Sequence, residues 1–254
     1  MPSKRYGAIC PISHACKVVE PRWTIHVLTE MWAGSTRFND IRRGVGNISP
    51  GLLSKRLKEL EVAGMVDRVE NKATGTVDYF RTQKAIDLEP ALNALGVWAQ
   101  QNIAAEIALC DTDVSALMWK LRREIHTEKF PAQRVIFQFH FNDENLARDT
   151  FWIVFYPGGE RDLCVTKPSY DINLYIETDL VSLGGILTGR TNIGRELENG
   201  SLFLSGDTRL AQTMNQWLPF SYYIDVEGIV PLRANNGPHA ERFSDKQENV
   251  CMTE

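Results

Sequence analysis

Short helical patterns separated by turn residues fill residues 10–81, and this spacing constrains the fold more than any other feature of the chain. Pro21 suits the first turn of a helix, where its missing N–H costs nothing, and Gly34 is expected to end that helix. Apolar residues return at helical spacing in the next segment, at Phe38, Ile41 and Val45. The pattern therefore predicts three helices, over residues 12–19, 21–33 and 37–44.

A fourth helix is expected to begin at Ser49, an N-cap residue followed by Pro50 in the first turn, and to end at Gly64. Its apolar residues form one stripe: Leu53, Leu57 and Leu60. Small and basic residues lie on the opposite face, at 100° per residue: Gly51, Ser54, Lys55 and Lys58. A helix that presents such groups outward can enter the major groove of DNA.

Two short strands are expected next, over residues 66–69 and 77–82, around a Gly-containing tip that carries Lys72. Helices three and four followed by this hairpin predict a winged helix-turn-helix that reads duplex DNA.

Charge is distributed unevenly along the chain. The net charge of −4 argues against a nucleic-acid binder, but residues 1–110 carry +3 and the remainder −7. Residues 37–84 carry +4. The positive potential is thus concentrated where the helix-turn-helix is predicted, although a solvated face could show the same modest excess.

Eleven residues form the predicted DNA-binding site. Ser49, Ser54, Lys55 and Lys58 are expected to reach base edges or phosphates, and Arg42, Arg43 and Lys72 to contact phosphates. Arg56 lies nearer the buried stripe, so we expect it to bridge core and backbone rather than read bases. The full set is Arg37, Arg42, Arg43, Ser49, Pro50, Gly51, Ser54, Lys55, Arg56, Lys58 and Lys72.

A long apolar stripe over residues 88–108 predicts one more helix, with Pro90 in its first turn. We expect this helix to pack against its copy in a second subunit, since symmetric dimers are the commonest assembly. The alternative is a linker helix packed on the second domain. The residues of this predicted dimer interface are Leu88, Leu92, Leu95, Ala99 and Ile103.

The pattern changes after residue 111. A helix over 113–126 precedes strict alternation at Val135, Phe137, Phe139 and Phe141, which predicts a half-buried strand. Three further strands of an antiparallel meander are expected over 151–156, 163–165 and 174–176, with helices at 180–187 and 207–218. The fold class is therefore α+β, with domains at 1–110 and 111–232 and a flexible tail at 233–254.

The first domain resembles the HxlR-type bacterial winged-helix regulators, which are related to the MarR type. The resemblance rests on Cys10-Pro11, Arg22-Trp23-Thr24, Gly34, residues 37–41, Ile48-Ser49-Pro50, residues 53–61, Gly64-Met65-Val66, Asp78-Tyr79, Thr82 and Trp98. The sequence departs from this family in two places. It has Glu20-Pro21 where these regulators usually have two glycines, and Gln83-Lys84-Ala85 where they usually have an acidic residue, Lys and Gly at the end of the wing. Neither departure touches the predicted DNA-reading face.

The second domain is similar to sterol-carrier-protein domains, on the shorter motifs of residues 183–189 and 204–207 followed by Leu210, Met214, Trp217 and Leu218. This resemblance implies a sheet covered by helices over an apolar tunnel. A tunnel wall and a packed core share one periodicity, so both interpretations stay open. The residues that would line the tunnel are Trp119, Phe137, Phe139, Trp152, Leu183, Met214 and Trp217.

The five cysteines are odd in number and not closely paired, which is untypical of a secreted disulfide protein. No signal-peptide core or run of about 18 apolar residues occurs, so a cytoplasmic protein is expected. Cys10 is a candidate redox sensor, because a helix start favours the thiolate, although a structural cysteine is commoner. Cys10, His14, Cys16 and His26 match no usual zinc spacing, so no metal site is predicted.

No phosphate-binding loop, dinucleotide fingerprint, nucleophile elbow or metalloprotease histidine pair is present, so we expect neither an enzyme nor a cofactor. The predicted function is a homodimeric regulator that binds a pseudo-palindromic DNA operator and responds to a small apolar or aromatic ligand. The alternatives are a carrier that uses the winged helix only as a dimerisation scaffold, and a regulator that senses redox state through Cys10.

Overall fold

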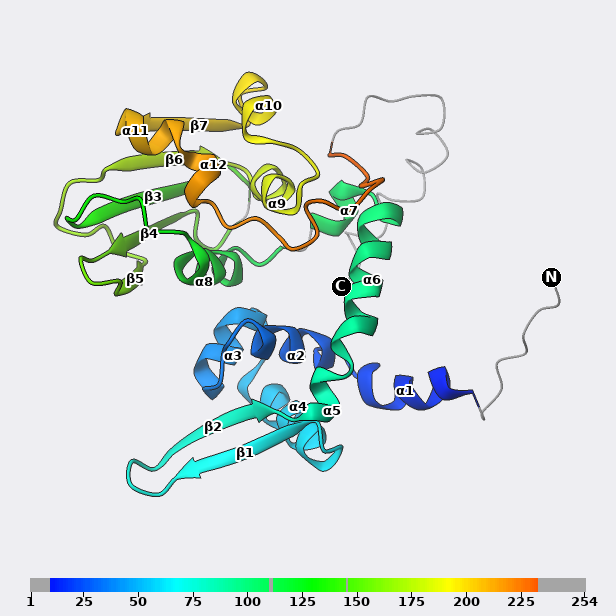
Figure 1. The fold of residues 1–254 in the computed structure, drawn as a ribbon. Coiled ribbons are helices and arrows are strands. Elements are labelled where there is room, and N and C mark those ends of the chain that lie inside the picture. The colour runs from blue at the N-terminus through cyan, green and yellow to red at the C-terminus, as the bar shows by residue number, and fades with distance from the viewer. Residues whose placement is uncertain (1–9, 110–111, 145, 233–254) are drawn as a thin grey trace. The chain divides into compact units, whose positions relative to one another are not determined.

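The computed structural model describes residues 10–109, 112–144 and 146–232, and the chain divides into two compact units, residues 1–93 and 94–254 (Figure 1). Each unit has its own apolar core. The tail predicted from residue 233 lies outside the described residues.

The helices of the first unit follow the predicted order. They are α1 (Pro11–Val19), α2 (Thr24–Trp32), α3 (Phe38–Val45), α4 (Pro50–Val62) and the short α5 (Gln83–Ile86). The predicted start of the second helix at Pro21 was wrong. Trp23 has a φ of 78°, in the left-handed region that a helix excludes, so α2 begins at Thr24, three residues after the predicted start.

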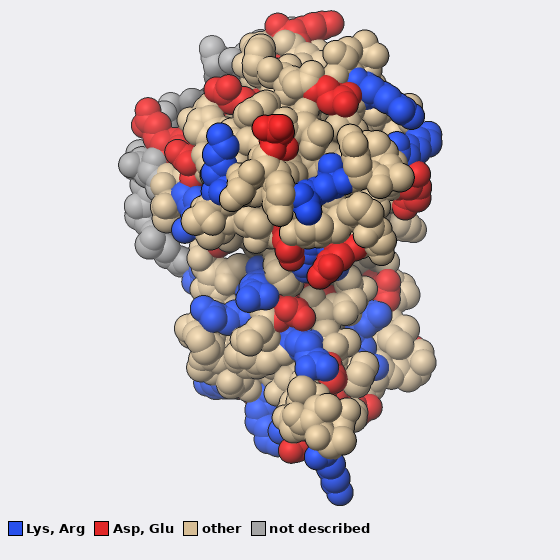
Figure 2. Space-filling model, turned by 90° about the vertical axis from the view of Figure 1, so that its left-hand side faces the viewer, with Lys and Arg blue, Asp and Glu red and all other residues tan. Residues whose placement is uncertain are grey.

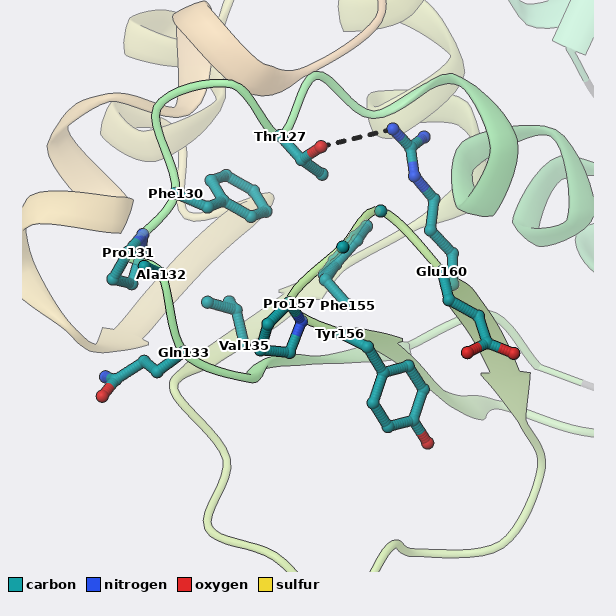
Figure 3. A pocket seen from close by; sticks show the side chains of 13 residues that line it. Thr127, Phe130, Pro131, Ala132, Gln133, Val135, Phe155, Tyr156, Pro157 and Glu160 are labelled. Atoms are coloured by element: carbon teal, nitrogen blue, oxygen red, sulfur yellow. Dashed lines mark hydrogen bonds between the residues drawn. The ribbon is translucent and has the colours of Figure 1, made fainter.

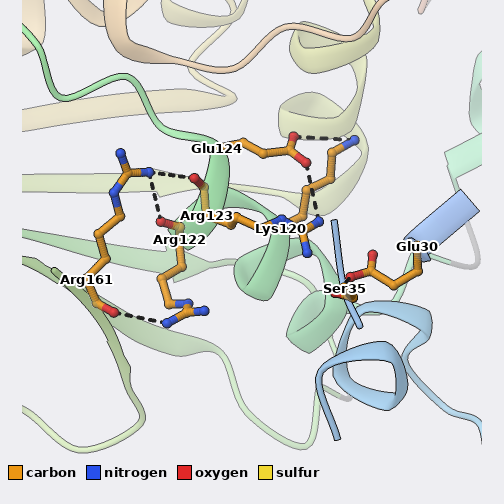
Figure 4. Close-up of polar contacts among 7 residues, drawn as sticks. All are labelled: Glu30, Ser35, Lys120, Arg122, Arg123, Glu124 and Arg161. Atoms are coloured by element: carbon orange, nitrogen blue, oxygen red, sulfur yellow. Dashed lines mark hydrogen bonds and ion pairs between the residues drawn. The ribbon is translucent and has the colours of Figure 1, made fainter. Parts of the chain in front are cut away.

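The core of the first unit is formed by the inner faces of α2, α3 and α4, with Val27, Leu28, Ile41, Leu53 and Leu57 among its buried residues. Helices α2 and α3 pack closely at Gly44, where an added Cβ would lie 2.0 Å from Cδ of Glu30. The buried Glu30 carboxylate accepts a hydrogen bond from Ser35 Oγ (Figure 4). A side chain at residue 44 would therefore require the Glu30 carboxylate to move away from its buried position.

Strands β1 (Val66–Asn71) and β2 (Thr76–Arg81) form the predicted antiparallel hairpin. The hairpin is tied to the start of α3, because the Tyr79 N–H donates to the carbonyl of Thr36 at 2.8 Å. The Thr36 hydroxyl in turn donates to Asp78 Oδ1 at 2.9 Å. Together with the helices, this hairpin completes a winged helix-turn-helix, as predicted.

Helix α6 (Glu89–Asn102) spans the boundary of the two units in sequence. The other helices of the second unit are α7 (Ala105–Leu109), α8 (Val114–Glu124), α9 (Leu180–Thr188), α10 (Ile193–Glu198), α11 (Thr208–Gln212) and α12 (Met214–Trp217). The prediction of one helix over 88–108 was wrong, and the helical segment expected over 207–218 consists of two short helices. Asn102 Nδ2 donates a hydrogen bond to the Trp98 carbonyl at 2.8 Å, and Thr213 Oγ1 donates one to the Arg209 carbonyl at 2.8 Å. Polar side chains that bond to the backbone nearby compete with the hydrogen bonds that would continue the helix.

The sheet of the second unit is mainly antiparallel and has the strand order β5-β4-β3-β6-β7. Its strands are β3 (Val135–Phe141), β4 (Thr150–Phe155), β5 (Arg161–Cys164), β6 (Leu174–Thr178) and β7 (Leu202–Gly206). The predicted meander was wrong at one pairing, because β6 lies parallel to β3, with Phe139 opposite Ile176. Since β4 already pairs with one side of β3, β6 takes the free side, and the unpredicted β7 extends the sheet beyond it.

The two faces of the sheet differ. Phe137 and Phe139 point into a core completed by α8, α9 and α12, and the Phe137 and Trp217 rings lie 4.8 Å apart. Ile136, Trp152 and Val154 form a smaller cluster apart from that core. On the edge strand β7, Phe203 is 61% exposed. The predicted α+β class is therefore confirmed, and the likeness to sterol-carrier proteins stays a prediction.

Among the described residues, no helix has both the length and the apolar character needed to cross a bilayer.

Candidate nucleic-acid interface

The start of α4 has the geometry expected of a recognition helix. The Ser49 hydroxyl accepts the Leu52 N–H at 3.3 Å and caps the helix, and Pro50 follows in the first turn. Leu53, Leu57 and Leu60 are buried. The residues predicted for the outer face are all exposed: Gly51, Ser54, Lys55 and Lys58. This face has the small and basic groups, and the access to solvent, that contact with base edges requires.

Arg56 has a different environment from its neighbours. Only 12% of its side chain is exposed. Its Nε donates to the Arg22 carbonyl at 2.8 Å, and its guanidinium pairs with Glu59. These contacts hold α4 against the segment that precedes α2. They favour a role in stabilising the domain, close to the bridging role expected from the helical angle.

The three arginines predicted on α3 differ in their partners. Arg37 Nε lies 2.6 Å from Asp78 Oδ1 of β2, and Arg43 lies 3.7 Å from Asp40. Arg42 is exposed and makes no ion pair with another described residue. Arg37 therefore helps to fasten the hairpin to α3, whereas Arg42 is the arginine of α3 best placed to meet a phosphate.

The tip of the hairpin is a compact turn. The Asn71 side chain accepts the Ala73 N–H at 3.0 Å, and the Asn71 carbonyl accepts the Gly75 N–H at 2.8 Å. Gly75 has a φ of 66°, a conformation that favours glycine. Lys72, between these residues, is exposed at the position expected for a phosphate contact.

A groove of about 330 Å³ runs between α4 and the hairpin. It is lined by Ser54, Leu57, Lys58, Glu61, Arg68 and Tyr79. Arg68 was not among the predicted residues. Its position on β1, opposite Tyr79 in the pairing register, faces it toward the recognition helix, and strand alternation after the buried Val66 could have indicated this.

Ion pairs moderate the positive charge of this surface. Lys58 Nζ lies 2.9 Å from Glu61, and Arg68 lies 3.4 Å from Glu70. Lys55 makes no ion pair within the described ranges. On the one face of the molecule that Figure 2 shows, Lys and Arg side chains are interspersed with Asp and Glu side chains. A surface of mixed charge is suited to individual contacts with bases and phosphates more than to attraction by an extended positive electrostatic potential.

The predicted dimer residues fall into two groups. Leu88, Leu92 and Ala99 are half-buried, and the carbonyls of Ala99 and Ile103 accept hydrogen bonds from Arg190. Leu95, by contrast, is 49% exposed, and Trp98, which was not among the predicted residues, is 52% exposed on the same helix. The end of α6 therefore packs within the second unit, as in the linker alternative, while Leu95 and Trp98 leave an apolar surface open.

The residues predicted to bind a ligand lie in different parts of the second unit. Phe137, Phe139, Leu183, Met214 and Trp217 are buried together in the main core. Trp152 belongs to the smaller cluster, and its Nε1 donates to Gln138. Trp119 is half-buried on α8, with the Arg122 guanidinium 4.1 Å from its ring centroid.

The cysteines and histidines near the N-terminus show no shared site. Cys10 is a half-buried free thiol at the N-cap of α1. No group of three or more potential ligand side chains that could hold a metal ion occurs among the described residues. Burial, and secondarily the charge of Arg22, lowers the pKa of His26, whose ring stacks edge-on against Trp23 at 5.3 Å.

Comparison with known proteins agrees with this geometry. Residues 18–107 match the HxlR-like helix-turn-helix family. The chain is 34% identical over 95 residues to the uncharacterized HTH-type transcriptional regulator YvaP of Bacillus subtilis. This match covers 37% of the chain and 88% of YvaP. It is 29% identical over 103 residues to the regulator YtfH of Escherichia coli, spanning 40% of this chain and 82% of YtfH.

Among solved structures, the reduced form of the transcriptional regulator YodB from B. subtilis is 29% identical and has a TM-score of 0.35, covering 37% of this chain and 95% of YodB. The extent and identity of the YvaP match decide the family. The chain belongs to the HxlR-like helix-turn-helix family.

Proposed function

We propose that this protein regulates transcription by inserting the first turns of α4 into the major groove of an operator. The observation that carries the proposal is the exposed face of Gly51, Ser54, Lys55 and Lys58 beside a groove bordered by the wing. Glycine and serine let the DNA approach closely, and lysines supply charge for bases or phosphates.

Two copies of the chain would act together. Leu95 and Trp98 expose large apolar side chains on α6, and apolar surface of this kind is commonly covered by a second subunit. A two-fold dimer would present two recognition helices to half-sites about 34 Å apart, or one turn of DNA, and its operator would be pseudo-palindromic.

The second unit would tune this binding. A small apolar or aromatic ligand held by residues 111–232 would change operator affinity by the ratio of its affinities for the DNA-competent and DNA-incompetent states. Whether this ligand lowers or raises transcription would depend on which state it binds better.

The test is to sequence the genomic DNA retained by the purified full-length protein and then to measure affinity for the recovered operator at several salt concentrations. A regulator gives one enriched site and an affinity that falls steeply with salt. A carrier that uses the winged helix only to dimerise gives weak binding without sequence preference, and that result would overturn the proposal.

Lysine variants locate the contact. Replacing both Lys55 and Lys58 by alanine is expected to weaken operator binding at least tenfold and to reduce the slope of log affinity against log salt by about 2, because two phosphate or base contacts are lost. The matched control is Lys167→Ala, an exposed lysine of the second unit, which should leave affinity and slope unchanged.

A further inference from the structure

A cavity of about 190 Å³ opens at one end of the sheet of the second unit. It lies between the loop that follows α8, residues 127–133, and the turn between β4 and β5, residues 156–160 (Figure 3). None of the seven residues predicted from the sequence to bind a ligand lines it.

The inner wall of the cavity is apolar. Phe130, Val135, Phe155 and Pro157 line it, and the Phe130 and Phe155 rings meet edge to face at 5.2 Å. An apolar cavity of about 150 Å³ is known to hold a benzene molecule. The space here therefore fits one aromatic ring with a small substituent, and the presence of Phe130 and Phe155 in the lining favours an aromatic ring as the occupant.

One side of the cavity is cationic. Arg161 lines it and is held in place by the end of α8: its Nη1 donates to the Arg123 carbonyl and its Nη2 to Thr127 Oγ1 at 3.3 Å (Figures 3 and 4). These partners are neutral, and Arg161 makes no ion pair with an acidic side chain among the described residues. The Arg161 guanidinium therefore retains a full positive charge beside an apolar wall.

The acidic residue of the lining does not neutralise that charge. The Glu160 side chain points away from Phe130 and Thr127 in Figure 3. The next acidic residue, Asp162, hydrogen-bonds to Tyr156, whose side chain also points away from Phe130. A ligand that brings its own negative charge would complement the site, because an anion can accept charge-assisted hydrogen bonds from a guanidinium.

We infer that this cavity binds a small carboxylate built on a single aromatic ring. The ring lies against Phe130 and Phe155, and the carboxylate accepts hydrogen bonds from Arg161. The inference names the chemistry of the ligand that the proposed function assigns to the second unit, and its regulatory meaning rests on that function.

The experiment is calorimetric or ligand-observed NMR titration of the full-length protein with benzoate, and with benzyl alcohol as the uncharged probe of matched size. We expect benzoate to bind with a Kd of about 0.1–1 mM, as its size allows, and benzyl alcohol at least tenfold more weakly. No benzoate binding at about 10 mM, or equal affinity for the two probes, would overturn the inference.

Two variants test the site itself. Arg161→Gln should weaken benzoate binding at least tenfold and change benzyl alcohol binding less than about threefold. Arg209→Gln, an exposed arginine of α11, is the matched control and should change neither. Arg161 also binds carbonyls at the end of α8, so a second variant is needed that leaves this helix end intact. Ala132 is exposed and lines the cavity, and in Ala132→Trp the indole ring should fill the cavity. This variant should abolish binding of both probes.

The titration contains no DNA, so its outcome is independent of the operator measurement. Loss of benzoate binding with intact operator binding removes only the ligand inference. Failure to enrich an operator removes the proposed function and leaves the cavity chemistry standing.

Discussion

The two units contain equal numbers of basic residues, and the clearest examples of two different uses of these residues lie in different units. Residues 1–93 and 94–254 contain 14 Lys and Arg each. In the first unit Arg42, Lys55 and Lys72 extend into solvent beside the recognition helix. In the second, Arg161 and Arg190 donate to backbone carbonyls. Basic side chains thus extend into solvent, as on the predicted DNA-binding surface, or hold the fold together, as at Arg190 in the second unit and Arg56 in the first.

Arg190 is the clearest member of the inward-facing group. It is 4% exposed, and its guanidinium donates to the carbonyls of Ala99, Ile103 and Val230. Burial lowers the pKa of Arg190, and the nearby Glu106 carboxylate opposes this shift. A cation at the C-terminal end of α6 also interacts favourably with the helix dipole.

The largest effect is expected from Arg190→Ala, which should lower the free energy of unfolding by about 3–5 kcal/mol because three carbonyls lose their donor. Urea unfolding followed by tryptophan fluorescence measures it. Arg42→Ala, on an exposed arginine of the first unit, should cost less than about 0.5 kcal/mol. If both variants cost the same, the contrast between the units fails.

Gly44→Ala should lower the stability of the first unit by about 1–3 kcal/mol, because its Cβ would meet the buried Glu30 carboxylate. Thermal unfolding followed by circular dichroism checks the prediction. A melting temperature equal to that of the unmodified protein would mean that α2 and α3 separate at little cost.

Gly51→Ala is the matched alanine substitution on the face of α4 proposed to meet DNA, where the new Cβ meets no atom of the protein within 4 Å. We expect a gain in stability of about 0.5–1 kcal/mol from helix propensity, together with an operator affinity about fivefold lower because the methyl group lies on the contact face. A gel-shift titration beside the melting curve separates the two effects. Unchanged affinity would place this turn of α4 outside the contact.

The smallest effect concerns His26. Its pKa in the folded protein is lowered from 6.5, so the unfolded chain binds the proton more readily. Stability is then lost as the pH falls through 6.5 toward the folded-state value, and is retained above 6.5. His26→Gln should flatten this part of a stability profile against pH. Parallel profiles for the two proteins would contradict the assignment.

Local chemistry was predicted well from the sequence, whereas long-range pairing was not. The start of α4 and its buried face depend on Ser49, Pro50 and the leucine stripe, which lie within a few turns of one another. The exposed face of the helix could therefore be predicted from the sequence alone. The parallel pairing of β6 with β3 joins segments more than 30 residues apart, and no local signal specifies it.

The site shows the same division. The exposure of Lys55 was predicted from its angular position on the helix. The hydrogen bond from Arg56 to the Arg22 carbonyl, by contrast, depends on how the segment before α2 packs against α4. Likewise, the position of Arg161 beside Phe130 follows from a turn and a loop that meet only in the folded sheet.

Strand β7 closes one side of the sheet, and its five residues, Leu202–Gly206, include neither a charge nor a proline. Natural proteins usually protect an edge strand with lysine, proline or a β-bulge, because its unpaired backbone N–H and C=O groups can pair with a strand of another chain. With Phe203 protruding beside it, this edge is the place where concentrated preparations are expected to self-associate. A lysine at position 203 would be the simplest means to keep them monodisperse.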